Sequence, residues 1–122
     1  MRDIVTITKA LANEVRLRIL MMLSDGELCA CQIIEVLDLA PSTVSKHLSI
    51  LHQARLVDAR KNGRWVYYQR SRAETSPIGG DIFRWLRESL KNDDQIKTDA
   101  VTLKKITKIG VEELCKRRAQ KD

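Results

Sequence analysis

The change of pattern after residue 55 constrains the fold of this chain most strongly. Before it, Val44, Leu48 and Leu51 recur at the i, i+4 and i+7 spacing of a helix that packs one face. After it, two runs rich in β-formers flank Asn62-Gly63, a dipeptide typical of a type I′ hairpin turn with two positive φ angles. The sequence therefore predicts a helix followed directly by a two-stranded ribbon, with strands over about 56–60 and 65–70.

Helical spacing also precedes and follows this pair of elements. Ile4, Ile7 and Leu11 indicate a first helix, Asn13 is a suitable N-cap for a second, and a short third helix is expected over roughly 30–37. Pro41 suits the first position of the fourth helix, where its missing N–H costs nothing. A further helix is expected over 77–90, with Ile78, Ile82, Trp85 or Leu86, and Leu90 on one side.

Two short helices joined by a tight turn form a helix-turn-helix, and a β-hairpin directly after it forms a winged helix. We therefore expect a mainly α fold with a β-hairpin wing, in a domain spanning residues 1–91. Residues 92–122 read as a charged tail with one weak helix, broken at Gly110, and this tail carries Cys115.

The positive charge of the chain is concentrated in the predicted helix and hairpin. Residues 40–72 contain seven basic residues and one acidic residue, and their net charge of +6 equals that of all 122 residues. A concentrated positive field favours a polyanion as partner, most simply double-stranded DNA. A solvated basic face with no partner is the alternative from charge alone.

The fourth helix and the hairpin supply the candidate DNA-binding residues. The major groove admits a helix, and a wing can lie on phosphates or in the minor groove. On the exposed face of the helix these residues are Ser42, Thr43, Ser45, Lys46, His47 and Ser49. On the wing they are Arg60, Lys61, Asn62 and Arg64.

Bulk composition bounds the class of protein. The sequence has no apolar run of about 18 residues and no signal-peptide block at its start, so we expect no membrane span and a cytoplasmic protein. Three cysteines make a poor disulfide framework. The chain shows neither a C-x-x-C motif beside a βαβ unit nor a phosphate loop, so we expect no catalysis and no organic cofactor. A nucleoid protein that binds DNA without an inducer remains an alternative.

The chain resembles the ArsR/SmtB family of winged-helix repressors that respond to metals and metalloids, over about residues 5–90. The resemblance rests on "LANEVRLRILMML", "GELCACQI", "PSTVSKHLSILHQARLV" and "RKNGRWVYYQ". It implies a homodimer, built here from the first helix and the helix at 77–90, that binds a partly palindromic operator and is released by an inducer. Within the match, "ELCAC" is similar to the arsenic-responsive branch, in which a third cysteine often lies three residues beyond the pair. This chain has Ile34 at that position.

Cys29 and Cys31 are the candidate inducer ligands, with Cys115 as the one further thiol in the sequence. Residues at i and i+2 of a regular helix point to well-separated sides, so we expect Cys29 at or before the helix start. The positive end of a helix favours the thiolate, which is the form that binds soft ions. As(III) and Sb(III) prefer three sulfurs, and we therefore expect As(III) or Sb(III) on Cys29, Cys31 and Cys115.

Two other readings of the cysteines stay open. The chain can be a thiol redox sensor through a Cys29–Cys115 or Cys31–Cys115 disulfide, or a Cd(II)- or Pb(II)-responsive repressor with three thiolates. Zinc sensing is disfavoured, because the two histidines, His47 and His52, lie in the proposed DNA-reading helix.

Overall fold

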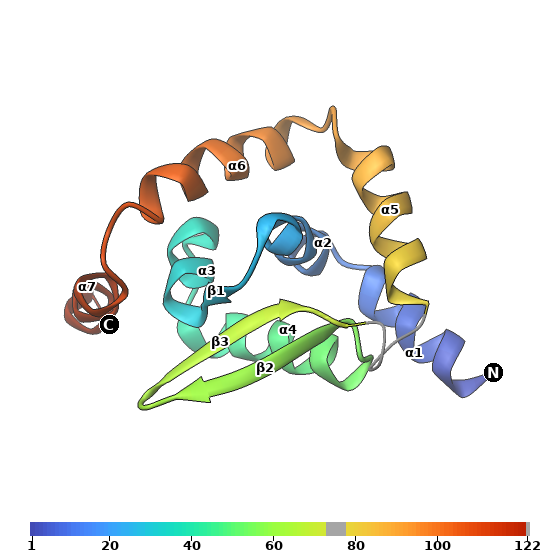
Figure 1. Ribbon diagram of the computed structural model, residues 1–122, viewed down its shortest axis with the longest axis horizontal. Helices are drawn as coiled ribbons and strands as arrows, with labels where there is room; N and C mark the ends of the chain where they lie inside the picture. The colour runs from blue at the N-terminus through green and yellow to red at the C-terminus, as the bar shows by residue number, and fades with distance from the viewer. Residues whose placement is uncertain (73–77, 122) are drawn as a thin grey trace.

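The computed structural model describes residues 1–72 and 78–121. Helices dominate these residues, with a small three-stranded sheet on one side (Figure 1). In chain order the elements are α1 (Arg2–Leu11), α2 (Glu14–Met22), the 3-10 turn η1 (Leu23–Asp25), β1 (Leu28–Cys29), α3 (Ala30–Leu37), α4 (Pro41–Gln53), β2 (Val57–Asn62), β3 (Trp65–Arg70), α5 (Gly79–Leu90), α6 (Asp94–Ile106) and α7 (Val111–Lys121). Within the described ranges, no helix combines the length and the apolar character that crossing a bilayer requires.

The predicted winged helix-turn-helix is confirmed by α3, α4 and the hairpin β2–β3. The Asn13 side chain accepts a hydrogen bond from the Arg16 N–H and so caps α2. Pro41 opens α4, whose buried side carries Val44, Leu48 and Leu51. Residue 77, where the sequence placed the start of the next helix, lies outside the described residues, and α5 begins at Gly79.

The hairpin turn differs from the predicted type. Asn62 is the last residue of β2 and pairs with Trp65, so Gly63 and Arg64 form the two-residue loop. Among the residues of this turn, Asn62, Gly63 and Arg64, only Gly63 has a positive φ, at 64°. The expectation of two positive φ angles at Asn62-Gly63 is therefore wrong. A glycine at the first loop position meets the one left-handed requirement that this loop imposes.

A third strand, β1, joins the sheet in the order β1-β3-β2. It is antiparallel to β3, with Leu28 opposite Tyr68 and Cys29 opposite Tyr67. The sequence alone did not predict this strand, because two residues carry no detectable alternation. Its consequence is that Cys29 belongs to the sheet of the wing and also adjoins α3.

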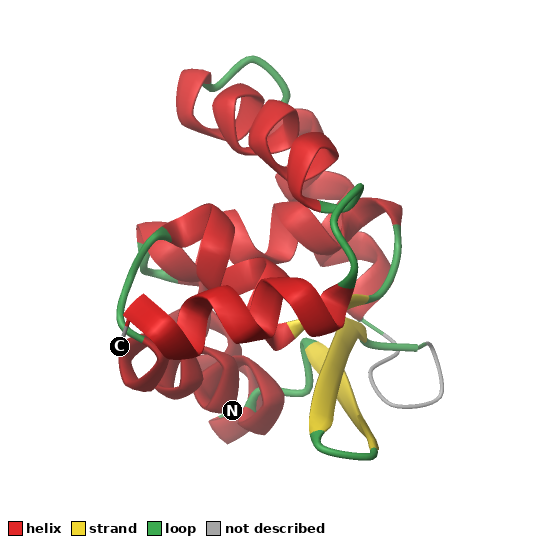
Figure 2. Ribbon diagram, turned by 90° about the vertical axis from the view of Figure 1, so that its left-hand side faces the viewer, coloured by secondary structure: helices red, strands yellow, loops and turns green. Residues whose placement is uncertain are grey.

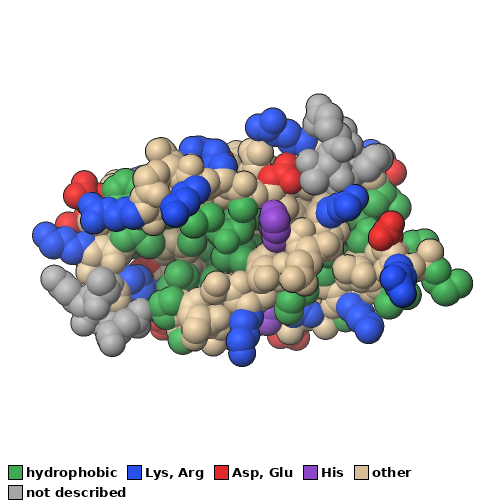
Figure 3. Space-filling model, turned by 90° about the horizontal axis from the view of Figure 1, so that it is seen from below, with side chains coloured by type: hydrophobic (Ala, Val, Ile, Leu, Met, Phe, Trp, Pro, Cys, Tyr) green, Lys and Arg blue, Asp and Glu red, His purple; other side chains and the backbone are tan. Residues whose placement is uncertain are grey.

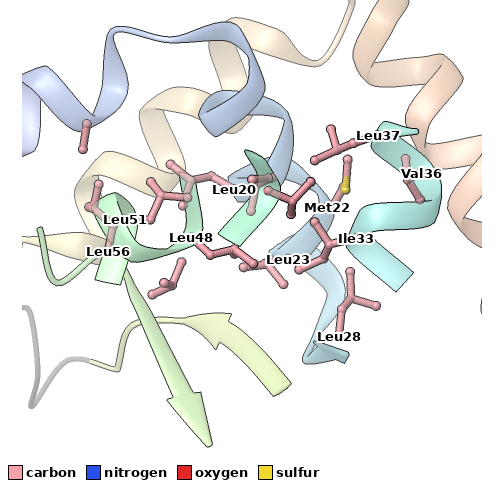
Figure 4. Packing of buried hydrophobic residues seen from close by; sticks show 14 of the residues in the cluster. Leu20, Met22, Leu23, Leu28, Ile33, Val36, Leu37, Leu48, Leu51 and Leu56 are labelled. Carbon is pink, nitrogen blue, oxygen red and sulfur yellow. The ribbon is translucent and has the colours of Figure 1, made fainter. Parts of the chain in front are cut away.

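The core is mainly aliphatic, although it includes Phe83 of α5. Figure 4 shows Leu20, Leu23, Ile33, Leu48 and Leu56 meeting between α2, α3, α4 and the start of the hairpin. Burial of these side chains fixes α3 and α4 against α2, so the helix-turn-helix is held from behind by the rest of the domain.

The C-terminal segment forms one helix more than the sequence predicts. The weak helix expected before Gly110 is α6, which arcs over α2 and α3, and a second helix, α7, follows Gly110 and lies beside α3 (Figures 1 and 2). Asp99 of α6 is buried and accepts two hydrogen bonds from Arg18 of α2, at 2.8 and 2.9 Å. The domain boundary at residue 91 stays a prediction.

Candidate inducer site and DNA-binding surface

Three cysteines meet where the start of α3 faces α7. Cys29 is the N-cap of α3, Cys31 lies in its first turn, and Cys115 comes from α7. Their sulfur atoms all lie within 4.8 Å of one another. The structure thus brings together all three thiols that the sequence singles out, although Cys115 lies 84 residues beyond Cys31.

The backbone at Cys29 explains how an i, i+2 pair can face one point. Cys29 is extended, with φ −72° and ψ 147°, and it precedes the first helical residue. Its N–H donates to Oε1 of Gln32 at 2.8 Å, which is one half of a capping box. Because Cys29 is outside the helix, the rule that residues at i and i+2 of a helix point to different sides does not apply to this pair. Both side chains can therefore lie on the same side of α3.

Cys31 and Cys115 are joined by a disulfide, and Cys29 is a free thiol with 1% of its surface exposed. Binding of an ion by all three sulfurs requires this bond to be reduced, because the thiolate is the ligand. The same cluster can therefore exist in two chemically exclusive forms, an oxidised pair or three thiolates.

A surface hollow of about 370 Å³ opens beside Cys115. The wing residues Arg64 and Trp65 line one side of it, and Glu112 and Lys116 of α7 line the other. Cys31 and Cys115 are themselves half-buried. A small solute can therefore approach the cluster between the wing and α7 without the core opening.

A buried arginine, which the sequence pattern did not single out, connects α7 to α3. Arg118 donates from Nε to Glu35 at 2.7 Å and from Nη2 to Asp38 at 3.0 Å, and both acceptors belong to the C-terminal half of α3 or its cap. Burial disfavours its charge, but the hydrogen bonds to Asp38 and Glu35 outweigh it and raise the pKa of Arg118. Its spacing from Cys115, one helical turn, is the signal that could have indicated a shared face.

A second ion pair connects the cysteine segment to the wing. Arg60 forms a two-pronged pair with Glu27, at 2.8 and 2.7 Å, and its guanidinium also lies 4.6 Å from the centre of the Tyr67 ring. The hydrogen bond from Arg60 lowers the pKa of Glu27. Glu27 lies two residues before Cys29, so this ion pair and the β1–β3 pairing both join the segment around Cys29 to the wing.

The candidate DNA-reading residues of α4 lie on its outer side. Ser42, Thr43, Ser45, Lys46 and Ser49 are exposed. The wing residues Arg60, Lys61, Asn62 and Arg64 are exposed too, and Figure 3 shows Lys and Arg side chains spread along the face of the molecule seen from below. Contact of these residues with DNA stays a prediction.

His47 departs from the exposed pattern. It is half-buried, and its Nδ1 lies 3.2 Å from Nη1 of Arg16, which also donates to the carbonyls of Ala10 and Lys9 at the end of α1. Burial, and then the charge of Arg16, lower the pKa of His47. The contact between His47 and Arg16 joins α4 to α2, and Arg16 in turn joins α2 to the end of α1, a link that the sequence did not indicate.

Comparison with curated proteins gives several transcriptional regulators, among them regulators of arsenic and of cadmium resistance. The chain is 30% identical over 112 residues to the arsenic resistance transcriptional regulator ArsR1 of Pseudomonas putida, covering 84% of this chain and 81% of the relative. It is 44% identical over 64 residues to the arsenical resistance operon repressor of Escherichia coli, covering 52% and 55% of the two chains. A cadmium resistance regulatory protein homolog from Staphylococcus aureus is 36% identical over 67 residues, covering 54% and 55%.

Solved structures agree with this result. The homodimeric winged helix-turn-helix domain of a possible ArsR-family regulator from Mycobacterium bovis superposes with a TM-score of 0.63 and 27% identity, covering 76% of this chain and 82% of that one. HlyU from Vibrio cholerae superposes with a TM-score of 0.58 and 37% identity, covering 69% and 91%.

The model of the bacterial regulatory proteins of the arsR family matches residues 13–59, from the cap of α2 into β2. These are the residues that build the helix-turn-helix and carry Cys29 and Cys31. With the relatives and the fold, they establish that this chain belongs to the ArsR family of transcriptional regulators.

Proposed function

We propose that this protein is a repressor that binds operator DNA as a homodimer and is released when As(III) or Sb(III) binds Cys29, Cys31 and Cys115. The observation that carries the proposal is the group of three sulfur atoms within 4.8 Å of one another. Thiolates select soft acceptors, and a trivalent arsenic ion takes three of them. Relatives named for arsenic resistance support the same inducer class.

The proposed release follows from the two elements that adjoin Cys29. The residue caps α3, the first helix of the helix-turn-helix, and it pairs with Tyr67 of the wing. Drawing Cys29 toward Cys31 and Cys115 would shift α3 and β1 together and so change the orientation of α4 relative to the wing. The inducer can lower operator affinity only by its preference for the shifted state over the DNA-binding state.

The experiment uses an operator selected from a randomised duplex pool by the reduced protein, and follows release by fluorescence anisotropy as arsenite is added. We expect the wild-type protein to leave the duplex, with one arsenic bound per subunit. We expect Cys115→Ser to bind the duplex normally but to need more arsenite for release, since two sulfurs give a partial site. Arsenite that binds without weakening the DNA complex would refute the proposal.

A matched rescue can show that the third sulfur is what Cys115 contributes. Ile34 is half-buried on α3, three residues beyond Cys31, at the position where the resemblance places a third cysteine. We expect Ile34→Cys in the Cys115→Ser background to restore release at lower arsenite concentrations. The single change Ile34→Cys serves as the control for effects on packing.

A second candidate function is favoured by the Cys31–Cys115 disulfide. Hydrogen peroxide would oxidise these two thiols to the disulfide and be reduced to two molecules of water, and DNA affinity would respond to this oxidation. Cys29→Ser separates the two functions, because it removes one arsenic ligand but leaves the oxidisable pair. Release of Cys29→Ser by peroxide as in the wild type, together with a higher arsenite requirement than that of the wild type, would show that both operate.

Cd(II) or Pb(II) on the same three thiolates is the remaining inducer class. The cadmium resistance homolog among the relatives supports testing it. If cadmium releases the wild-type protein at lower concentrations than arsenite does, the inducer is Cd(II) and not As(III). The proposed three-cysteine site would then stay the same.

A further inference from the structure

Arg118 is a buried cation that neither the DNA-binding face nor the apolar core requires. Its side chain is 11% exposed, and its guanidinium joins α7 to α3 through Glu35 and Asp38. Removing a charged group from water is costly unless it is paired, and charge-assisted, hydrogen-bonded pairs are the strong ones. The ion pairs of Arg118 with Glu35 and Asp38 therefore indicate that α7 is held in one position on α3.

Apart from the Cys31–Cys115 disulfide, which the reduced protein lacks, helix α7 has few other contacts that hold it in place among its described side chains. Its sequence, "VEELCKRRAQK", is mainly polar, and of the described side chains Leu114 is the one that joins the hydrophobic core. A helix of this length is marginal in water without tertiary contacts. Because α7 packs chiefly against α3, its register and rotation depend on contacts with that helix.

The contacts follow the same order along both helices. Cys115 meets Cys31 near the start of α3, and Arg118 meets Glu35 and then Asp38 toward its end. Cys115 and Arg118 are three residues apart, so they lie on the same side of α7. Fixing Arg118 at the C-terminal end of α3, where a cation is also favoured by the helix dipole, fixes the rotation that turns Cys115 toward Cys31.

We infer that Arg118 is a positioning residue that delivers the third sulfur, Cys115, to the inducer site of its own subunit through Glu35 and Asp38. This inference rests on the proposed function of the three cysteines. In this arrangement α7 packs against α3 of the same chain and completes the three-sulfur site there. The affinity of the site for arsenite then depends on the ion pairs of Arg118, which lie away from the sulfur atoms.

The test compares Arg118→Ala with Arg117→Ala in the reduced, full-length protein, with arsenite as the probe. Arg117 is the adjacent residue, and its exposed side chain pairs only with Glu113 of its own helix among the described residues. Loss of a partner that orients a ligand typically weakens metal affinity roughly 10- to 100-fold. We expect a rise of that order in the arsenite dissociation constant for Arg118→Ala and none for Arg117→Ala.

Two further readouts separate positioning from a general loss of stability. X-ray absorption at the arsenic edge should count three sulfur neighbours in the wild type and in Arg117→Ala, but two in Arg118→Ala. In the Cys115→Ser background, Arg118→Ala should have no further effect, because the residue acts through the missing sulfur. Arg118→Lys, which keeps one charged donor, should recover part of the affinity.

Glu35→Gln weakens the same contact from the α3 side and carries the test if Arg118→Ala does not fold. Three sulfurs and wild-type arsenite affinity in either variant would overturn the inference. A wild-type protein that binds no arsenite through three sulfurs would instead overturn the proposed function, and the two failures are therefore distinguishable.

Discussion

At the scale of single residues, the N-cap position of Cys29 decides what the cysteine pair can do. An extended residue before the first turn is free of the 100° step of a helix, so Cys29 and Cys31 can converge on one point. The C-x-C spacing and its place before an apolar helix were sufficient to predict this position. The pairing of Glu27 with Arg60 and of Arg118 with Glu35 was not predictable, since only the folded chain brings these partners near. The contact of Gln32 with Cys29 is local, because the two residues lie three positions apart.

The wing gives a prediction about its two neighbouring cations. Lys61→Ala should weaken binding to all duplexes alike and flatten the dependence of log affinity on log salt by roughly 0.9, the value for one lost phosphate contact. Arg60→Ala should flatten it less, because Glu27 already neutralises Arg60. Salt titrations of both variants on one duplex measure the difference. A change in the preferred operator with an unchanged slope in Lys61→Ala would contradict the assignment of the wing to phosphates.

A prediction about pH follows from His47. Its lowered pKa means that the unfolded chain takes up a proton near pH 6.5, whereas the folded chain takes it up only at lower pH. The free energy of unfolding should therefore include a contribution that is complete above pH 6.5 and is lost as the pH falls through the pKa of the folded state. Urea unfolding on both sides of pH 6.5 should show a smaller change in His47→Gln than in the wild type.

Equal pH dependence in the wild type and His47→Gln would mean that folding does not lower the pKa of His47, and would contradict this prediction.

At the scale of elements, α6 shows where sequence patterns stop being informative. The helix-turn-helix and wing could be predicted because their apolar residues follow strict periods and their turns use Pro and Gly. Helix α6 lacks a strong apolar stripe, and part of its attachment is the pair between Asp99 and Arg18, which are 81 residues apart. A contact between residues so distant in the sequence leaves no local pattern, and the sequence therefore indicates only a weak helix in this segment.

The attachment of α6 can be tested by removing its buried carboxylate. Asp99→Ala should lower the free energy of unfolding by about 2 kcal/mol, the scale of hydrogen bonds to charged groups, because Arg18 loses both acceptors. Glu113→Ala, which breaks an exposed pair on α7, should cost less than about 0.5 kcal/mol. Urea denaturation measures both. Equal, small losses in the two variants would show that α6 is held by apolar contacts alone.

At the scale of the whole molecule, the exposed apolar residues of α1 and α5 support the proposed homodimer. Ile4 is 64% exposed and Trp85 61%, whereas Leu86, which the sequence grouped with them, is 3% exposed in the core. Helical spacing alone could not separate Trp85 from Leu86, since adjacent residues both border the apolar stripe. The surface available to a second copy is therefore smaller than the sequence indicates and centres on the outer faces of the two helices.

Trp85→Glu should turn the proposed dimer into a monomer in sedimentation experiments and weaken binding to a two-half-site duplex, because one winged helix reads one half-site. Val101→Glu is the matched control, since Val101 is 56% exposed but lies on α6. It should stay dimeric. A wild-type protein that sediments as a monomer at micromolar concentration, or a dimeric Trp85→Glu, would contradict this interface.

The central claim is that an ion on the three thiolates releases the protein from DNA. The most direct measurement is the arsenite concentration that releases half of the bound operator, compared between the reduced wild type and the double variant Cys29→Ser/Cys31→Ser. We predict equal DNA affinity without arsenite, and no release of the double variant at concentrations that fully release the wild type. Release of the double variant at wild-type concentrations would contradict the account, and Cys29 and Cys31 would then be small packing residues with no part in sensing.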